Sequence, residues 1–530
     1  MKTRKVISMV LALAVCAGLG GCGEKKETAG NTNADGKMTI SWLGIPWFGT
    51  AKEGGYAETL LEDRYDIEIS PLFYDKEGYA DKKSVTMLGG NIPDLIYELD
   101  PIDVKNDVNQ GFIREIPLEL IKEKAPDYFQ FINENCPKAW LYSNVDGKNY
   151  GLPNLDYIGN IPSNGVWRAD WLENLGIEKI PQTIDEFHDA LYKMRHNDPD
   201  GNGQKDTYGM TGDVTTWHQM FSNIFGAYNA RPFCWVSTDE GIVYGGLQDN
   251  VKEALTTLAQ WYKEELIHPE FISDNIYDST KFINGTVGYV AYGGGDTIND
   301  TENKNSLINK ITAVNPDAKV TNAYFPVGPN GDYGAYVWGH AAHVVSFGKN
   351  CDDEKLDKLL GMMNDMITDD DLAVKLHMGE FGTMWQYKDD ALKEGGGVEY
   401  TDEFDPIYSE HALSYELGFS FFDPVHINFE LASKFVKDAT KEYRAEYIPE
   451  DAGQGDYFGK VDVVPSAAKY LEGLRNQQII IMTKIIRGEE DVSYYDEFAK
   501  YWESQGGAEL TKEANELDGT LQEIYDQIGL

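Results

Sequence analysis

The chain has 530 residues, of which 42% are hydrophobic and 12% aromatic, and it carries a formal net charge of −42 at pH 7. A chain of this length can bury a large core by packing alone. Its acidity excludes nucleic acid as an expected partner, because phosphate binding requires a basic surface.

The N-terminus has the pattern of a secretory signal. Three positive charges within the first five residues precede an apolar run over 6–15 and a short stretch of small residues. The apolar run is too short for the roughly 20 residues that a membrane-spanning helix needs. We therefore predict that residues 1–21 are a signal peptide that is removed.

The signal ends in Leu19-Gly20-Gly21-Cys22, which resembles the bacterial lipobox. In that motif the cysteine is acylated and becomes the mature N-terminus, so Cys22 is the expected lipidation site. Residues 22–37 are polar and predict a flexible tether. The expected location is the extracytoplasmic face of the cell membrane, held by a lipid anchor, although an ordinary cleaved signal with an incidental cysteine is the alternative.

Strands and helices alternate after the tether. We expect strands at 37–44, 66–70 and 91–97, with helices at 56–64 and 79–88 between them. This alternation predicts an α/β fold with a mostly parallel sheet. Ligands of such sheets bind beyond the carboxyl ends of the strands, where Trp47 and Asp100 lie. Asp100 also fits a helix cap beside Pro101.

The rest of the chain is richer in helices. Thr183 and Glu186 have capping-box spacing at the start of one helix. A further helix is expected over 251–264, and a helix leads into a strand near 282–290. Two more helices, over 467–486 and 494–505, dominate the C-terminal third.

Oxygen-bearing residues alternate along the segment 198–206. The predicted metal ligands are Asp198, Asp200, Asn202, Gln204 through its carbonyl, and Asp206. Gly203 stands at position 6, where a calcium loop turns sharply, so a structural Ca²⁺ site is expected. Position 12 is Gly209 instead of a bidentate Glu, which leaves water or a carboxylate such as Asp213 to complete the shell. The alternative is an Asp/Gly-rich turn without metal.

Aromatic residues near strand ends and loops are candidates for ligand contact. Sugars present apolar C–H faces to rings and hydroxyls to polar side chains, so a carbohydrate site needs both kinds of residue. The candidate rings are Trp47, Trp217, Tyr292, Trp338 and Trp385, and Asp100 is a candidate hydroxyl acceptor. For each ring, core packing is the competing interpretation.

Several passages together resemble the bacterial family 1 extracellular solute-binding proteins, in particular the lipoprotein subgroup of carbohydrate ABC transporters. They are DGKNYGLP at 146–153, RADWLENLG at 168–176, the stretch from Thr183 through DPDGNG at 198–203, and IIRGE at 485–489 with YDEF at 495–498. Their order behind a lipobox makes the resemblance fairly specific, and it covers nearly all of the mature chain.

The resemblance implies two α/β lobes joined by hinge segments, with a ligand cleft between them. By analogy, the chain would cross between lobes near Asn154, 287–290 and 341–345. The N-terminal lobe would then contain 38–154 and 289–340, and the C-terminal lobe 155–288 and 341–530. These boundaries rest on the resemblance alone.

The resemblance implies that the protein captures a small ligand by cleft closure and delivers it to the permease subunits of an ABC importer, and the expected ligand is an oligosaccharide. The resemblance implies no catalytic activity, and a monomer is the simplest arrangement. Two alternatives stay open: a secreted glycoside hydrolase with a pair of carboxylates, and the same fold binding a peptide or amine.

Overall fold

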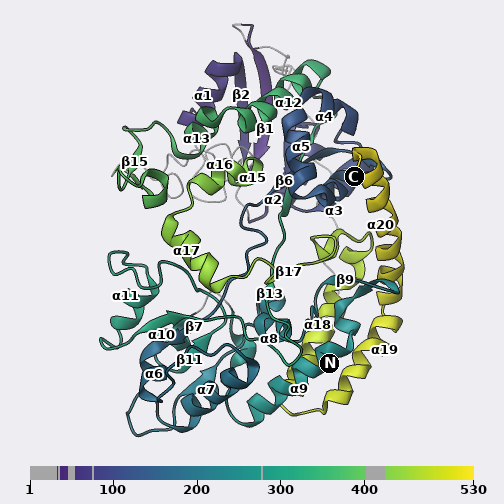
Figure 1. Ribbon diagram of the computed structural model, residues 1–530. Coiled ribbons are helices and arrows are strands. Elements are labelled where there is room, and N and C mark those ends of the chain that lie inside the picture. Colours follow the sequence, from purple (N-terminus) through teal and green to yellow (C-terminus); the bar gives the residue numbers. More distant parts are fainter. Residues whose placement is uncertain (1–32, 34–35, 46–53, 75–76, 276–278, 402–423) are drawn as a thin grey trace, which may run out of the picture.

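The computed structural model describes residues 33, 36–45, 54–74, 77–275, 279–401 and 424–530 (Figure 1). Cys22 and Trp47 lie outside the described residues, so the lipidation of Cys22 and the ligand contact of Trp47 stay predictions. Within the described part, no helix combines the length and the apolar character needed to cross a membrane.

A five-stranded sheet forms the core of the upper lobe in Figure 1. Its order is β2 (Ile67–Phe73), β1 (Met38–Gly44), β3 (Leu95–Glu98), β14 (Ala341–Phe347) and β6 (Gly151–Leu155). Strand β1 pairs in parallel with β2 and β3, as the alternating sequence pattern predicts, whereas β14 is antiparallel to both of its neighbours. The surrounding helices are α1 (Tyr56–Tyr65), α2 (Tyr79–Leu88), α3 (Pro101–Asn109), α4 (Leu118–Lys124), α5 (Pro126–Asn135), α12 (Asp353–Thr368) and α13 (Asp370–Met378).

A four-stranded mixed sheet forms the core of the lower lobe. Its order is β12 (Val320–Asn322), β7 (Val166–Arg168), β11 (Val287–Val290) and β8 (Tyr208–Met210). Helices α6 (Ala169–Asn174), α7 (Ile184–His196), α8 (Ser222–Gly226), α9 (Asp249–Lys263), α10 (Thr280–Ile283) and α11 (Leu307–Thr312) belong to this half, with the hairpin of β9 (Trp235–Thr238) and β10 (Gly241–Tyr244). The capping box of Thr183 and Glu186 opens α7 as predicted.

The strand pairing corrects the predicted lobe boundaries. Strands β11 and β12 pair within the lower sheet, so 289–340 does not belong with the first 154 residues, and β14 lies in the upper sheet instead of the C-terminal lobe. Val344, Val345 and Phe347 on β14 are buried, which fixes this strand in the upper core. The chain passes between the two sheets after β6 and between β12 and β14. Helix α17 (Asp438–Tyr447), which follows α16 (Phe429–Lys434), contacts the segment 393–396 near its start and Tyr324 near its end. Residues 287–290 are therefore a strand inside the lower lobe and not a crossing, whereas 341–345 lie in the strand that directly follows the crossing between β12 and β14.

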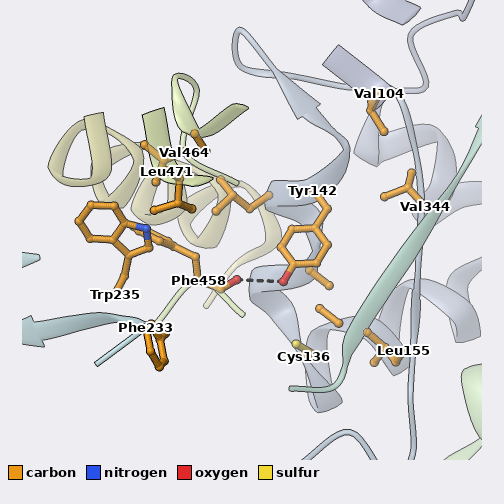
Figure 2. Packing of buried hydrophobic residues seen from close by; sticks show 14 of the residues in the cluster. Val104, Cys136, Tyr142, Leu155, Phe233, Trp235, Val344, Phe458, Val464 and Leu471 are labelled. Atoms are coloured by element: carbon orange, nitrogen blue, oxygen red, sulfur yellow. Dashed lines mark hydrogen bonds between the residues drawn. The ribbon is translucent and has the colours of Figure 1, made fainter. Parts of the chain in front are cut away.

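The C-terminal helices join the two lobes. Helix α18 (Ala467–Ile486) packs on α9, α19 (Asp496–Ser504) follows it, and α20 (Gly507–Ile528) contacts both β10 and the short helix η1 (Pro137–Ser143) of the upper lobe. Figure 1 shows α20 running along one side of both lobes. At the junction the Tyr142 hydroxyl donates to the Phe458 carbonyl over 3.2 Å, among the apolar side chains of Figure 2.

The remaining elements are short. Strands β15 (Trp385–Tyr387) and β16 (Val398–Tyr400) form a hairpin next to α13, and α15 (Pro424–Ile427) precedes α16. Strand β13 (Ala335–Tyr336), in the crossing between β12 and β14, pairs with β17 (Gly453–Gln454), and β4 (Asn144–Val145) pairs with β5 (Lys148–Asn149). The crossing between β12 and β14 is thus held by a strand from the C-terminal part of the chain.

Candidate functional site

Two predicted ligand-binding residues meet at the crossing between β12 and β14. Trp217, in the short helix η2 (Trp217–Gln219) of the lower lobe, lies 4.9 Å from the His218 ring, and Trp338 lies 4.1 Å from the same ring. The Tyr336 ring is 5.1 Å from His218. We call Trp217, His218, Tyr336 and Trp338 the central aromatic group.

The central aromatic group is only partly covered. Trp338 is 54% exposed, and Trp217 and His218 are half-buried. Large apolar rings that stay exposed at the junction of two lobes are suited to contact a ligand, because burial of a ring face on closure stabilises the complex. Trp217 and Trp338, both predicted to contact the ligand, therefore lie in one group of side chains.

Arg475 of α18 completes this group on one side. Its guanidinium carbon lies 4.2 Å from the centroid of the Trp217 ring, a cation–π arrangement. Burial, together with the positive charge of Arg475, lowers the pKa of His218 to about 4, so the imidazole is neutral at neutral pH. Both ring nitrogens of His218 are buried and have no hydrogen-bond partner among the described residues. A neutral imidazole offers one donor and one acceptor, which a ligand hydroxyl or a water molecule can satisfy.

Asp100 lies at the contact between the lobes. It stands at the N-cap of α3 before Pro101, and its carboxylate is 3.0 Å from the ammonium of Lys460. Burial and the charge of Asp100 raise the pKa of nearby Asp462, whereas Lys460 and Arg475 act in the opposite direction. Asp100 therefore caps a helix and is ion-paired, and Asp462 links it electrostatically to Arg475.

Tyr292 follows the carboxyl end of β11 and is half-buried. Its loop lies against the first crossing, where the Gly294 amide donates to the Asn164 carbonyl over 3.0 Å. A Cβ on Gly294 would come within 2.0 Å of the Asn164 side-chain oxygen, so only glycine allows this approach. The position agrees with ligand binding beyond the strand ends.

Trp385 is a buried packing residue, which agrees with the core-packing interpretation. Its side chain is only 4% exposed, and its indole N–H donates to the Gly379 carbonyl over 3.0 Å. Its ring contacts Phe381, Tyr387 and Phe435, with which it forms what we call the outer aromatic group. In this conformation the ring has no free face to offer a ligand.

The predicted calcium loop lies before β8 and turns its side chains inward. The Asn202 and Gly203 amides donate to the Asp198 carboxylate over 3.1 and 2.9 Å, and the Asn202 side-chain amide donates to Asp200 over 2.8 Å and to Asp206 over 3.3 Å. Burial, followed by the hydrogen bond with Asp198, raises the pKa of Asp200. The oxygen-rich side chains converge on the Asn202 amide, which is the kind of donor set that a hard cation prefers.

The same loop departs from a preformed metal site. No three His, Cys, Asp or Glu side chains of the described residues are grouped so that they could hold a metal. Asp213, considered as a completing ligand, lies beyond the other end of β8, where burial and nearby Asp274 raise its pKa to about 7. Binding of Ca²⁺ would therefore need Asn202, backbone oxygens such as that of Gln204, and water.

Comparisons with known proteins decide the family. Residues 55–365 match the model of the family described as "Bacterial extracellular solute-binding protein". The chain belongs to this family of solute-binding proteins. Its relatives include lipoprotein LipO of Bacillus subtilis (strain 168), 24% identical over 478 residues that cover 86% of this chain and 87% of LipO. Another is the polygalacturonan/rhamnogalacturonan-binding protein YtcQ of the same strain, 22% identical over 535 residues that cover 97% of this chain and 98% of YtcQ.

Solved structures share the fold of this solute-binding protein. An extracellular solute-binding protein from Bifidobacterium longum subsp. infantis superposes with a TM-score of 0.64 at 16% identity, over 92% of this chain and 99% of that one. The S. pneumoniae ABC-transporter substrate-binding protein FusA, in complex with kestose, gives 0.60 at 16% identity over the same shares. At this identity the likeness establishes the two-lobed binding-protein fold, as the sequence predicts.

Several site residues of this solute-binding protein were not predicted from the sequence. His218 and Tyr336 adjoin Trp217 and Trp338, so neighbourhood in sequence is a usable signal for them. Arg475 and Asp462 come from the C-terminal part of the chain, more than 100 residues from either tryptophan. The packing of α18 on α9 brings Arg475 to the site, and Asp462 lies on the short helix η7 (Val461–Val463) that contacts α18.

Proposed function

We propose that this solute-binding protein captures an oligosaccharide between its lobes, at the central aromatic group, and delivers it to the membrane subunits of an ABC importer. The observation that carries the proposal is the exposed Trp338 ring, which lies beside His218 and Trp217 in the crossing between β12 and β14. Hinge closure over this crossing would bury the sugar against rings from both sides of the junction.

The polar groups at the junction suit a ligand with many hydroxyls. His218 offers a donor and an acceptor, and Arg475 offers N–H groups within the same cluster. YtcQ, which is similar to almost the whole chain, is named as a binding protein for two polysaccharides. Ring faces together with directional polar groups are the combination that carbohydrate recognition needs.

The role proposed is binding without turnover. Isothermal calorimetry of the purified protein against a mixed oligosaccharide library, followed by its fractions, tests it directly. Saturable heat with sugar recovered unchanged supports the proposal, whereas degraded sugar would point to a hydrolase. Heat only with peptides or amines would replace the oligosaccharide by another ligand class.

We further propose that the mature protein is a monomer anchored to the extracytoplasmic face of the membrane through lipidated Cys22. The lipobox and the polar tether support this arrangement, because a tethered receptor stays near its importer. Metabolic labelling with a fatty-acid analogue tests it. Label that persists in a Cys22→Ser variant would contradict it.

Calcium in the loop 198–206 is proposed as a structural ion. The side chains of Asp198, Asp200, Asn202 and Asp206, with the Gln204 carbonyl, would surround it, and its charge would compensate the carboxylates that now share the Asn202 amide. The ion would hold the loop between α7 and β8, away from the central aromatic group. Calorimetric titration of the purified protein with Ca²⁺ tests this site.

A further inference from the structure

Arg475 has a cationic group without a carboxylate partner. Its guanidinium lies over Trp217, and the described residues provide no ion pair or hydrogen bond to it. Its side chain is half-buried at the end of the central aromatic group. By contrast Arg487, near the end of the same helix, is exposed and lies 3.1 Å from Glu489.

The groups around Arg475 give its guanidinium no hydrogen-bonded carboxylate among the described residues. The positive charge of Arg475 acts on the Asp462 carboxyl, whose pKa is raised by burial and by the charge of Asp100, but the two groups form no ion pair. Lys460 is paired with Asp100, and His218 is neutral. The site therefore presents one positive charge beside exposed aromatic surface.

We propose that Arg475, stacked on Trp217 in the same group as the exposed ring of Trp338, receives the carboxylate of an acidic sugar, so that this site takes uronate-containing oligosaccharides. The inference rests on the proposed function and narrows its ligand class. An anionic ligand is proposed despite the net charge of −42, which disfavours anionic ligands at long range. Exposed charges more than about 8 Å apart are largely screened at physiological ionic strength, so the local cation decides.

The geometry of arginine suits this role. A guanidinium with one face on an aromatic ring keeps its N–H edge available, and that edge fits a carboxylate in a bidentate manner. A pyranose carrying the carboxylate would lie over the neighbouring rings at the same time. A neutral sugar would offer Arg475 only hydroxyl oxygens, which form weaker hydrogen bonds with a guanidinium than a carboxylate does.

A matched pair of probes tests the ligand class. Trigalacturonate and its fully methyl-esterified form have the same rings and hydroxyls, and only the first carries carboxylates. Calorimetry of the purified protein should show trigalacturonate binding at least about tenfold more tightly than the ester, about 1.4 kcal/mol. Equal affinities, or binding of neutral oligosaccharides such as kestose without binding of trigalacturonate, would overturn the inference and leave the proposed function intact. Failure of every sugar to bind would remove the proposed function itself.

Variants test the residue. Arg475→Gln should lower the affinity for trigalacturonate much more than the affinity for the ester, and so remove most of the preference for the acid. Its unfolding transition, compared with that of the wild type, shows whether the variant is folded. Arg475→Lys should keep part of the preference, because it keeps the charge but not the planar fork. Arg487→Gln is the matched control on the same helix and should change neither affinity. A preference for trigalacturonate that survives Arg475→Gln would overturn the assignment.

Discussion

The central and outer aromatic groups contain the same kinds of residue in opposite situations. Trp338 in the central group is 54% exposed and stands beside a neutral imidazole, whereas Trp385 in the outer group is 4% exposed and already uses its indole N–H. Both residues fit the same sequence criteria for ligand contact. The comparison teaches that ring type does not separate recognition from packing, and that exposure and unpaired neighbours do.

Truncation of the outer ring should have the largest effect. Trp385→Ala removes a buried ring and should lower the free energy of unfolding by ~3–5 kcal/mol, because of lost burial and the cavity left behind. The affinity of the folded fraction for an oligosaccharide should not change. Denaturant unfolding and calorimetry on the same sample check both statements. A loss of affinity without a loss of stability would reverse the roles of the two groups.

Acid should weaken the central group selectively. His218 has a folded pKa of about 4, below its ordinary value of 6.5, so the unfolded chain binds more protons between these values and stability falls as pH drops through this window. The contribution lost is up to ~3 kcal/mol, from a linkage of ~1.4 kcal/mol per pKa unit. His218→Gln should unfold with a shallower pH dependence between pH 6.5 and 4. Identical slopes for the two proteins would contradict the buried, neutral imidazole.

Removal of calcium should affect stability and spare recognition. A chelator should lower the melting temperature of the wild-type protein, by an amount equivalent to ~2.7 kcal/mol when free Ca²⁺ had been at 100 times its dissociation constant. The double variant Asp198→Asn/Asp200→Asn should show no such shift. Oligosaccharide affinity should be equal with and without chelator, since the loop lies before β8 and outside the central aromatic group. If Ca²⁺ leaves the melting temperature unchanged, the loop is a metal-free turn.

Truncation of the central ring should have the smallest effect on stability and a clear effect on binding. Trp338→Ala should weaken oligosaccharide binding by about tenfold, ~1.4 kcal/mol. Because the ring is more than half exposed, the free energy of unfolding should change by no more than ~0.5 kcal/mol. Calorimetry and chemical unfolding measured side by side distinguish this from Trp385→Ala. Unchanged affinity would remove Trp338 from the site.

The features predicted correctly from the sequence are those encoded by neighbouring residues. The parallel strands β1, β2 and β3, the cap of α7 by Thr183, and the family itself depend on local patterns. The lobe boundaries were wrong because a strand's sheet is decided by partners far along the chain. β14 pairs with β3 and β6, from residues some 200 positions earlier.

The candidate site was harder to predict than the fold, because it combines residues from distant segments. Trp217 and Trp338 could be named as candidates, but so could Trp385, because burial was not visible in the sequence. Arg475 is an ordinary residue of an amphipathic helix until α18 places it over Trp217. Recognition that depends on several distant segments cannot be read from any one of them.

The most direct test of the account is the affinity of one binding oligosaccharide, measured by calorimetry for the wild-type protein, Trp338→Ala and Trp385→Ala. The account predicts that Trp338→Ala loses about tenfold in affinity while folded Trp385→Ala binds like the wild type. Wild-type affinity for Trp338→Ala together with lost binding by folded Trp385→Ala would contradict it.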